Sequence, residues 1–153
     1  MFAEIVLTLI ILLAVYVIRR AVIASLMGAA PVTVIPHILG LRYSENTGAA
    51  FSILSDRTIL LTVVTFTALA FMAYLIFIKR YGSRAERMFL VMIFSGGVGN
   101  LIERLLNGYV VDYFEFLFMR FAIFNLADSL ICVGVFLLLV YTFLEERKKD
   151  GHA

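Results

Sequence analysis

Residues 59–78 read ILLTVVTFTALAFMAYLIFI, and none of these side chains carries a charge. A helix rises about 1.5 Å per residue, so a stretch of this length crosses the roughly 30 Å hydrocarbon core of a bilayer. A run this long and this apolar predicts a membrane-spanning helix. Lipid is therefore the expected solvent, and the flanking sequence is expected to hold further spans.

The composition of the whole chain agrees with a membrane protein. Of its 153 residues, 63% are hydrophobic and 16% are charged, whereas soluble domains carry about 25% charged residues. A net charge of +2, with no basic run among aromatic residues, makes nucleic acid an unexpected partner. Cys132 is the only cysteine, so an intramolecular disulfide is impossible. No metal-ligand spacing is present, and neither a metal nor a cofactor is predicted.

Three more stretches are predicted to cross the membrane. They are Met1–Ile18, Met88–Ile102 and Ile123–Leu144, and the second of these is expected to continue through Glu103 and Arg104. The predicted spans are therefore about 1–18, 59–78, 88–104 and 123–144, in a single domain covering 1–153. The predicted fold class is an all-α membrane protein with four transmembrane helices and a small extracytoplasmic β-element.

Charge placement predicts the orientation of the spans. Segment 79–87 holds four Lys or Arg residues, and the tail at 147–149 reads RKK. Short basic segments stay in the cytoplasm, so both termini are expected there. Arg19 and Arg20 would then end the first span on the outer side, against this trend.

The long outward segment contains two β-prone runs. Val32–Ile35 and Leu39–Arg42 flank Pro36 and His37, which predicts two short strands around a turn. We expect this element to lie on the membrane surface. The small and polar residues that follow, at 43–51, are expected to turn back towards the polar ends of the helices.

Several ionisable or polar residues stand where lipid makes them costly. A charge at the centre of a span costs roughly 2.5–3.5 kcal/mol or more, so such groups usually face protein or water. Asp128 follows Asn125 by three residues, and this spacing predicts one helix face for both. Asn100 likewise shares a face with Glu103 and Arg104 at the end of the third span.

Asp112 completes a pattern that suits peptide hydrolysis. It lies in the β-prone stretch VVDYF at 110–114, and the loop is short enough to fold back beside Asp128. Two neighbouring carboxylates share a proton, so one can act as base and the other as acid. Arg104 could balance their charge, and Asn100 and Asn125 could orient substrate or water. The pattern alone leaves another reading open, in which both Asp side chains are solvated or paired with Arg.

The same residues lie in four segments that together resemble a known family. The segments are ENTGAAF (45–51), GGVGNLIER (96–104), GYVVDYF (108–114) and FNLADS (124–129). In this order and spacing they resemble the bacterial lipoprotein signal peptidases, also called signal peptidase II. The resemblance extends over nearly the whole chain and includes the number and order of the spans.

The resemblance implies a multi-pass aspartic peptidase of the bacterial plasma (inner) membrane, with its active site at the extracytoplasmic face. Its implied substrates are diacylglyceryl-modified prolipoproteins, cut just before the lipidated cysteine, and it implies a monomer in contact with membrane lipid. Asp112 and Asp128 fall on the catalytic pair of the family. The positions implied to bind or orient substrate are Asn46, Gly48, Asn100, Arg104 and Asn125.

Three positions depart from, or only partly keep, the family pattern. Where the family has an Asp near the end of the first span and a Lys four residues later, this chain has Tyr16 and Arg20. Glu103 replaces the usual Asp before the Arg of the third-span motif. Arg20 and Glu103 are therefore candidates for structural or substrate-positioning roles.

Two other functions are compatible with parts of the sequence. A divergent, non-catalytic relative would bind lipidated peptides without cutting them, but loss of Asp112 or Asp128 would be expected there. A small proton-coupled transporter would use Asp128 and Glu103 as a relay. Such proteins place acidic groups at the bilayer midplane and often have duplicated halves, and the sequence has neither feature.

Overall fold

The computed structural model describes residues 1–48 and 58–150. Within these residues, four helices are long and apolar enough to cross a membrane. They are α1 (Phe2–Leu26), α2 (Thr58–Ala73) with its π-helical continuation η2 (Tyr74–Ile78), α3 (Arg84–Asn107) and α4 (Leu126–Asp150). The predicted fold class, with four spanning helices and a small β-element, is confirmed.

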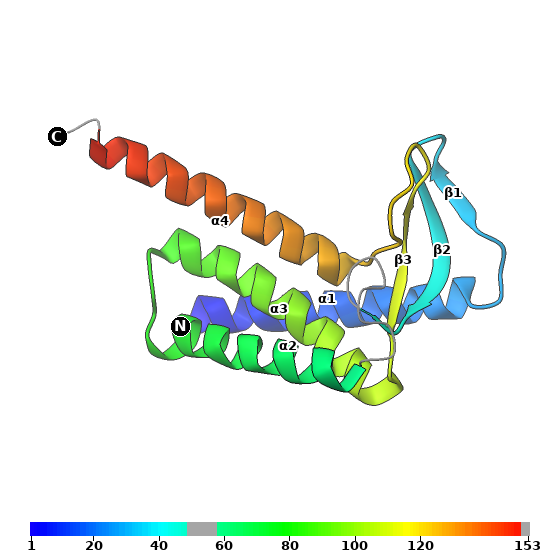
Figure 1. Ribbon diagram of the computed structural model, residues 1–153, viewed down its shortest axis with the longest axis horizontal. Helices are drawn as coiled ribbons and strands as arrows, with labels where there is room; N and C mark the ends of the chain where they lie inside the picture. The colour runs from blue at the N-terminus through cyan, green and yellow to red at the C-terminus, as the bar shows by residue number, and fades with distance from the viewer. Residues whose placement is uncertain (49–57, 151–153) are drawn as a thin grey trace.

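Helix α3 is the centre of the bundle. It packs against α1, α2 and α4, and the small sheet lies at one end of these helices (Figure 1). We call this the sheet end. Met1, the connection at residues 79–83 and the end of α4 all lie at the opposite end, which we call the loop end. The start of α1 and the end of α4 therefore lie on the same side of the bundle.

Small residues let α3 approach its neighbours closely. A Cβ atom added to Gly96 would lie 2.5 Å from the carbonyl oxygen of Ala127 in α4. A Cβ at Gly97 would lie 2.7 Å from a methyl group of Leu69 in α2. Packing between spans depends on such close contacts, since lipid tails are as apolar as the side chains they replace. The glycine run at 96–99 is thus a helix-packing motif.

The ends of α3 follow from local hydrogen bonding. Ser83 caps the helix, because its Oγ accepts from Glu86 N at 3.2 Å while its own N donates to Glu86 Oε2 at 2.6 Å. Gly108 ends the helix in the left-handed region, with φ 81°. The helix is therefore longer at both ends than the predicted span of 88–104.

Helix α1 continues past the predicted end at Ile18 to Leu26. Arg19 does not stop the helix because its guanidinium is buried against α3 and lies 3.3 Å from Glu103 Oε2. A charge that is paired inside the protein can be carried within a span. The helix thus continues beyond Arg19 and Arg20, which were predicted to end the first span.

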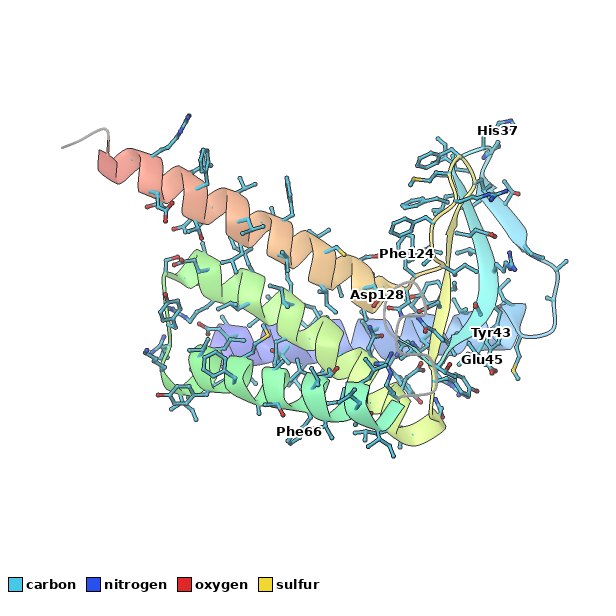
Figure 2. The ribbon with its side chains drawn as sticks, in the orientation of Figure 1. His37, Tyr43, Glu45, Phe66, Phe124 and Asp128 are labelled. Carbon is cyan, nitrogen blue, oxygen red and sulfur yellow. The ribbon has the colours of Figure 1, made fainter. Side chains whose placement is uncertain are left out.

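In the described part of the chain, three antiparallel strands form a sheet in the order β1 (Val32–Ile35), β2 (Leu39–Asn46) and β3 (Val110–Phe116). The first two are joined by a turn in which His37 has φ 62°, at the tip of the sheet far from Asp128 (Figure 2). The predicted strands at 32–35 and 39–42 are confirmed, but β2 runs further because β3 offers it a partner. Of the expected turn at 43–51, residues 49–51 lie outside the described residues.

The chain returns from β3 alongside itself before α4 begins. Phe124 pairs with Phe114, and its carbonyl oxygen accepts from the backbone N of Tyr113 at 2.9 Å and of Phe114 at 2.7 Å. The predicted fourth span began at Ile123, but these backbone bonds hold Phe124 in a bridge, and the helix begins at Leu126. The middle of β3 and the first turn of α4 are thereby brought together.

Candidate active site

Asp112 is held in place by the register of the sheet. It lies opposite Ser44 of β2, so Asn46, two residues further along β2, is its diagonal neighbour on the same face. Asn46 Nδ2 donates to Asp112 Oδ2 at 2.8 Å, and Asn125 Nδ2 donates to Oδ1 at 2.7 Å. The residue is only 3% exposed, and both of its carboxylate oxygens accept bonds from neutral amides.

Asp128 is oriented by the first turn of α4. Asn125 stands just before the helix, and its Oδ1 accepts from Asp128 N at 3.0 Å while its own N donates to Asp128 Oδ2 at 3.1 Å. This reciprocal arrangement is a capping box. The three-residue spacing therefore joins a cap to the third helical residue. The predicted sharing of one helix face by Asn125 and Asp128 was wrong.

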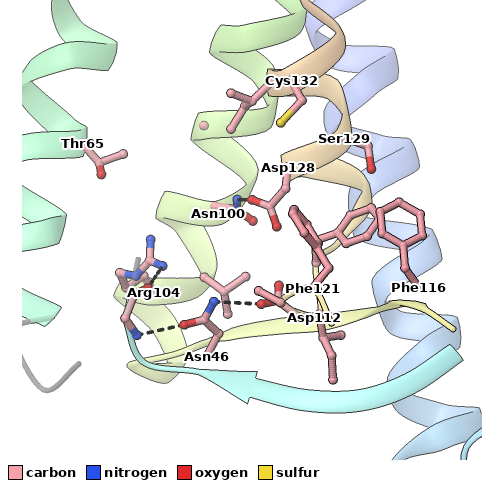
Figure 3. Close-up of a pocket in the computed structure, with 17 residues that line it drawn as sticks. Asn46, Thr65, Asn100, Arg104, Asp112, Phe116, Phe121, Asp128, Ser129 and Cys132 are labelled. Carbon is pink, nitrogen blue, oxygen red and sulfur yellow. Dashed lines mark hydrogen bonds between the residues drawn. The ribbon is translucent and has the colours of Figure 1, made fainter. Parts of the chain in front are cut away.

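Asn100 connects the two carboxylates from α3. Its Nδ2 donates to Asp128 Oδ1 at 2.7 Å, and its Oδ1 accepts from Asn125 Nδ2 at 3.2 Å. Since Asn125 also donates to Asp112, the amides form a continuous path from one carboxylate to the other. Figure 3 shows the hydrogen bond from Asn100 to Asp128, with Asp112 on the neighbouring strand. The structure therefore brings together both predicted carboxylates and both asparagines.

Arg104 and Gly48 meet beside this cluster. Arg104 Nη2 donates to the carbonyl oxygen of Gly48 at 2.9 Å, and Gly48 N donates to Asn46 Oδ1 at 2.9 Å (Figure 3). Asn46 is thus held through its Oδ1 while its Nδ2 reaches Asp112. Arg104 Nε is buried and has no hydrogen-bond partner within the described residues. Arg104 itself lines the cavity described next.

The polar cluster forms one end of a cavity of about 560 Å³. Asn46, Gly48, Asn100, Arg104, Asp112 and Asp128 line it together with the hydroxyl residues Thr65 and Ser129, and apolar residues of α3, α4, β3 and the segment before α4 contribute the rest. The apolar wall includes Gly97 of α3, Ile131 and Cys132 of α4, and the aromatic residues Phe116, Phe121 and Phe124. The cavity thus offers both an apolar compartment and a pair of carboxylates.

The two remaining predicted positions have different surroundings. Glu103 accepts from Val111 N at 2.9 Å, next to Asp112, and forms an ion pair with Arg19. Arg20 is exposed on α1 and lines a second cavity, of about 320 Å³, between α1 and α3. Tyr16 lines the same cavity and is 64% exposed, so this departure from the family pattern lies away from the carboxylates.

Arg19 was missed by the analysis of the sequence. It donates to Asn100 Oδ1 at 3.0 Å and is buried, whereas Arg20 next to it is exposed. The signal was present in the spacing of the residues that α1 buries against the bundle. They are Glu4, Thr8, Ile11, Val15, Arg19, Val22 and Leu26, three or four positions apart. Arg19 continues this stripe and Arg20 does not.

Burial raises the pKa of the Asp112 carboxyl to about 6. Removal from water is the largest cause, because it disfavours the charged form, and the negative charge of Asp128 acts in the same direction. The hydrogen bonds from Asn46 and Asn125 and the positive charge of Arg19 oppose this shift. A raised pKa is typical of a carboxyl group that shares a proton with a neighbouring carboxylate, which is the requirement for combined acid and base catalysis.

The chain is similar to known proteins over most of its length. The family model described as signal peptidase (SPase) II matches residues 5–144. The lipoprotein signal peptidase of Latilactobacillus sakei is 35% identical over 147 residues, which cover 96% of this chain and 97% of that protein. The lipoprotein signal peptidase of Streptococcus pyogenes serotype M1 is 42% identical over 112 residues, covering 73% of this chain and 74% of that protein.

Solved structures share the fold. A bacterial membrane enzyme determined by the in meso method at 2.3 Å resolution superposes with a TM-score of 0.86 and 27% sequence identity, covering 97% of this chain and 92% of that one. A second, determined by the same method at 1.9 Å, gives a TM-score of 0.82 and 26% identity, covering 93% of each chain.

Proposed function

This chain belongs to the signal peptidase II family, and from that premise we propose that it is an aspartic endopeptidase of the membrane. It removes the signal peptide from diacylglyceryl-modified prolipoproteins by cutting before the lipidated cysteine. The observation that carries the proposal is the pair formed by Asp112 and Asp128, joined through Asn100 and Asn125 at the polar end of one cavity.

The two carboxyl groups divide the chemistry of hydrolysis between them. The ionised carboxylate takes a proton from a water molecule, and the protonated one donates a hydrogen bond to the scissile carbonyl. The resulting oxygen nucleophile attacks the carbonyl carbon to form a tetrahedral intermediate. The C–N bond then breaks, the leaving amine receives a proton from a carboxyl group, and the pair again holds one proton. The raised pKa of Asp112 supports such proton sharing.

The partners of the carboxylates also support this role. Asn46, Asn100 and Asn125 contact them through neutral amides. A neutral donor orients a carboxylate without cancelling its charge, so the pair keeps both the base and the shared proton. Arg104 lines the same cavity as the carboxylates, where it binds a carbonyl of the substrate chain.

The shape of the cavity supports a lipidated substrate. Ile131 and Cys132 lie further along α4 than Asp128, so the apolar wall continues into the bundle from the polar end. Acyl chains fit this wall while the peptide carbonyl meets the carboxylates. Anchoring in lipid also confines the substrate to the membrane and sets its depth, which raises the effective concentration of the scissile bond at the pair.

The distribution of basic residues supports an orientation with the sheet end outside the cytoplasm. Segment 79–87 and the tail at 147–149 lie at the loop end, and basic segments remain in the cytoplasm. We therefore propose a monomer in a bacterial plasma membrane, with its active site at the extracytoplasmic face. A reporter fused after Ala153 should be active only in the cytoplasm, and activity only outside would contradict this orientation.

A matched pair of peptides tests the reaction and the substrate class. Purified protein in detergent or lipid is given a precursor peptide with a diacylglyceryl-modified cysteine and the same peptide with a free cysteine. We expect cleavage of the first only, at the bond before the modified cysteine, as located by mass spectrometry. Binding of the lipidated peptide without cleavage would instead identify a non-catalytic relative. Equal cleavage of both peptides would contradict the proposed substrate class.

A further inference from the structure

Arg19 is a buried cation for which the proposed reaction has so far no use. Arg19 is 4% exposed, and it lies in a helix that is long and apolar enough to span the membrane. Such a charge is costly to bury, so its surroundings must compensate it. The pairing with Glu103 neutralises the charge, but a neutral pair would also have satisfied these positions. The additional contacts of Arg19 indicate a second role.

Those contacts lead directly to the amides that hold the carboxylates. Arg19 Nη2 donates to Asn100 Oδ1 at 3.0 Å, and Nη1 donates to the carbonyl oxygen of Gly99 at 3.2 Å. Asn100 Oδ1 therefore accepts from both Arg19 and Asn125. If the side-chain amide of Asn100 were rotated by 180°, its NH2 group would face the N–H donors of Arg19 and Asn125, which is unfavourable. The orientation that puts Nδ2 on Asp128 is the one that Arg19 selects.

We propose that Arg19 is a positioning residue for the aspartic pair, acting through Asn100 on Asp128 and through Asn100 and Asn125 on Asp112. This inference rests on the proposed function, because it assigns a part in that reaction. Arg19 itself does not line the cavity of about 560 Å³, so it does not touch the substrate. Its effect should appear in the rate of the chemical step and not in the binding of the lipopeptide.

The charge of Arg19 adds an electrostatic effect to the geometric one. The charged or titratable groups that interact with it are Glu103 of α3, Asp112 and Tyr113 of β3, and Asp128 of α4. The positive charge of Arg19 opposes the rise in the pKa of Asp112. Loss of this charge should therefore move both limbs of the pH profile of cleavage to higher pH.

Three single variants separate geometry from charge. Arg19→Met should lower kcat by about 10- to 100-fold with little change in KM, since small displacements of reacting groups are enough for this effect. Its pH limbs should move up by about one unit. Arg19→Lys keeps the charge but not the forked geometry, so it should keep the limbs and recover only part of kcat. Arg42→Met, which removes an exposed arginine paired with Glu115, should match the parent.

A double variant protects the test against misfolding. Arg19→Met alone leaves the partly buried Glu103 without its cation, whereas Arg19→Met/Glu103→Gln leaves no unpaired charge and can still accept the bond from Val111 N. It should fold and show the kcat loss of the single variant. Parental kcat and parental pH limbs in a folded Arg19→Met protein would overturn the proposal, as would a double variant that fails to fold.

Cleavage by Asp112→Asn separates the role of Arg19 from the aspartic mechanism itself. Asp112→Asn is measured in the same assay. If it abolishes cleavage while Arg19→Met has no effect, the aspartic mechanism stands and the role of Arg19 falls. If Asp112→Asn retains cleavage, the mechanism itself is wrong, whatever the Arg19 variants do.

Discussion

The buried carboxylates at the loop end and at the sheet end of the bundle have different partners. At the loop end, Glu4 is 3% exposed and lies between positive groups, with Arg87 Nε at 3.0 Å and the N-terminal amine at 2.5 Å. At the sheet end, Asp112 and Asp128 accept hydrogen bonds from amides. Within the described residues, neither takes part in an ion pair, although both lie in a cluster that includes Arg19 and Arg104.

The two ends also differ in what covers the carboxylate. Arg87 closes over Glu4 and donates as well to the carbonyl oxygen of Gly82 at 2.7 Å, so the cluster ties the start of α1 to the connection before α3. Asp112 and Asp128 instead line a cavity. A carboxylate that is held by cations and covered is suited to joining helices. One that is held by neutral donors and faces a cavity can exchange a proton with a bound molecule.

The largest expected effect is the loss of cleavage when a carboxylate at the sheet end is replaced. Asp112→Asn and Asp128→Asn should each lower cleavage of the diacylglyceryl peptide by at least about 100-fold, because an amide can act neither as the base nor as the acid. The two losses should not add, since the carboxylates act as a unit. Cleavage rates and lipopeptide binding are measured on the same preparations. Near-parental cleavage by either variant would rule out the aspartic mechanism.

A smaller effect separates the cap of α4 from the orientation of Asp112. Asn125→Ser keeps a side chain that caps a helix well, but it lacks the amide that reaches Asp112 and Asn100. We expect an unchanged unfolding temperature and cleavage lowered by about 10- to 100-fold, as for a misplaced catalytic group. A variant that loses stability and activity in proportion would indicate that Asn125 serves the cap alone.

The pH dependence of cleavage should reflect the ionisation of Asp112 at the sheet end. With the pKa of Asp112 near 6, kcat/KM is expected to fall as pH rises through this value, by about tenfold per unit, because the protonated acid is lost. The folded-state pKa lies above the unfolded value, so Asp112 favours folding at low pH and this contribution is lost as pH rises through about 6. Unfolding temperatures should show this step, and Asp112→Asn should lack it.

The smallest effect on catalysis is expected at the loop end. Glu4→Gln removes the charge that faces Arg87 and should lower the free energy of unfolding by about 1–3 kcal/mol. Cleavage per folded molecule should stay within about twofold of the parent, because the clusters lie at opposite ends. Glu145→Gln, the same change in an exposed pair with Lys148, should leave the unfolding temperature unchanged. A Glu4 variant with normal stability would remove the contrast between the two ends.

Much of the site could be predicted from the sequence because its residues lie in short motifs. Residues 45–48, 100–104, 110–114 and 124–128 each carry polar groups at the ends of apolar or β-prone stretches. Their side chains meet at one end of the bundle, as predicted, since antiparallel spans bring alternate loops to the same side. The association of Asp112 with Asp128 followed from the length of the loop between them.

What only the tertiary structure decided is which side of each helix faces protein. In a soluble helix, the apolar face marks the buried side, but in lipid both faces are apolar and this signal is weak. Hydropathy therefore did not distinguish Arg19 from Arg20, although one is buried against Asn100 and the other is exposed. It also could not show that Asn125 caps α4, because the backbone bonds of Phe124 to β3 set where that helix begins.

The sequence by itself determined the spans, their order and the chemical groups of the site, because hydropathy and side-chain chemistry are local properties. The tertiary structure decided the hydrogen-bond partners of each carboxylate, because these depend on helix rotation and strand register. Glu4 and Asp112 are both acidic residues near the end of an apolar stretch, and composition does not separate them. Their neighbours do, since Arg87 joins one to a second helix and the amides of Asn46 and Asn125 hold the other beside a cavity.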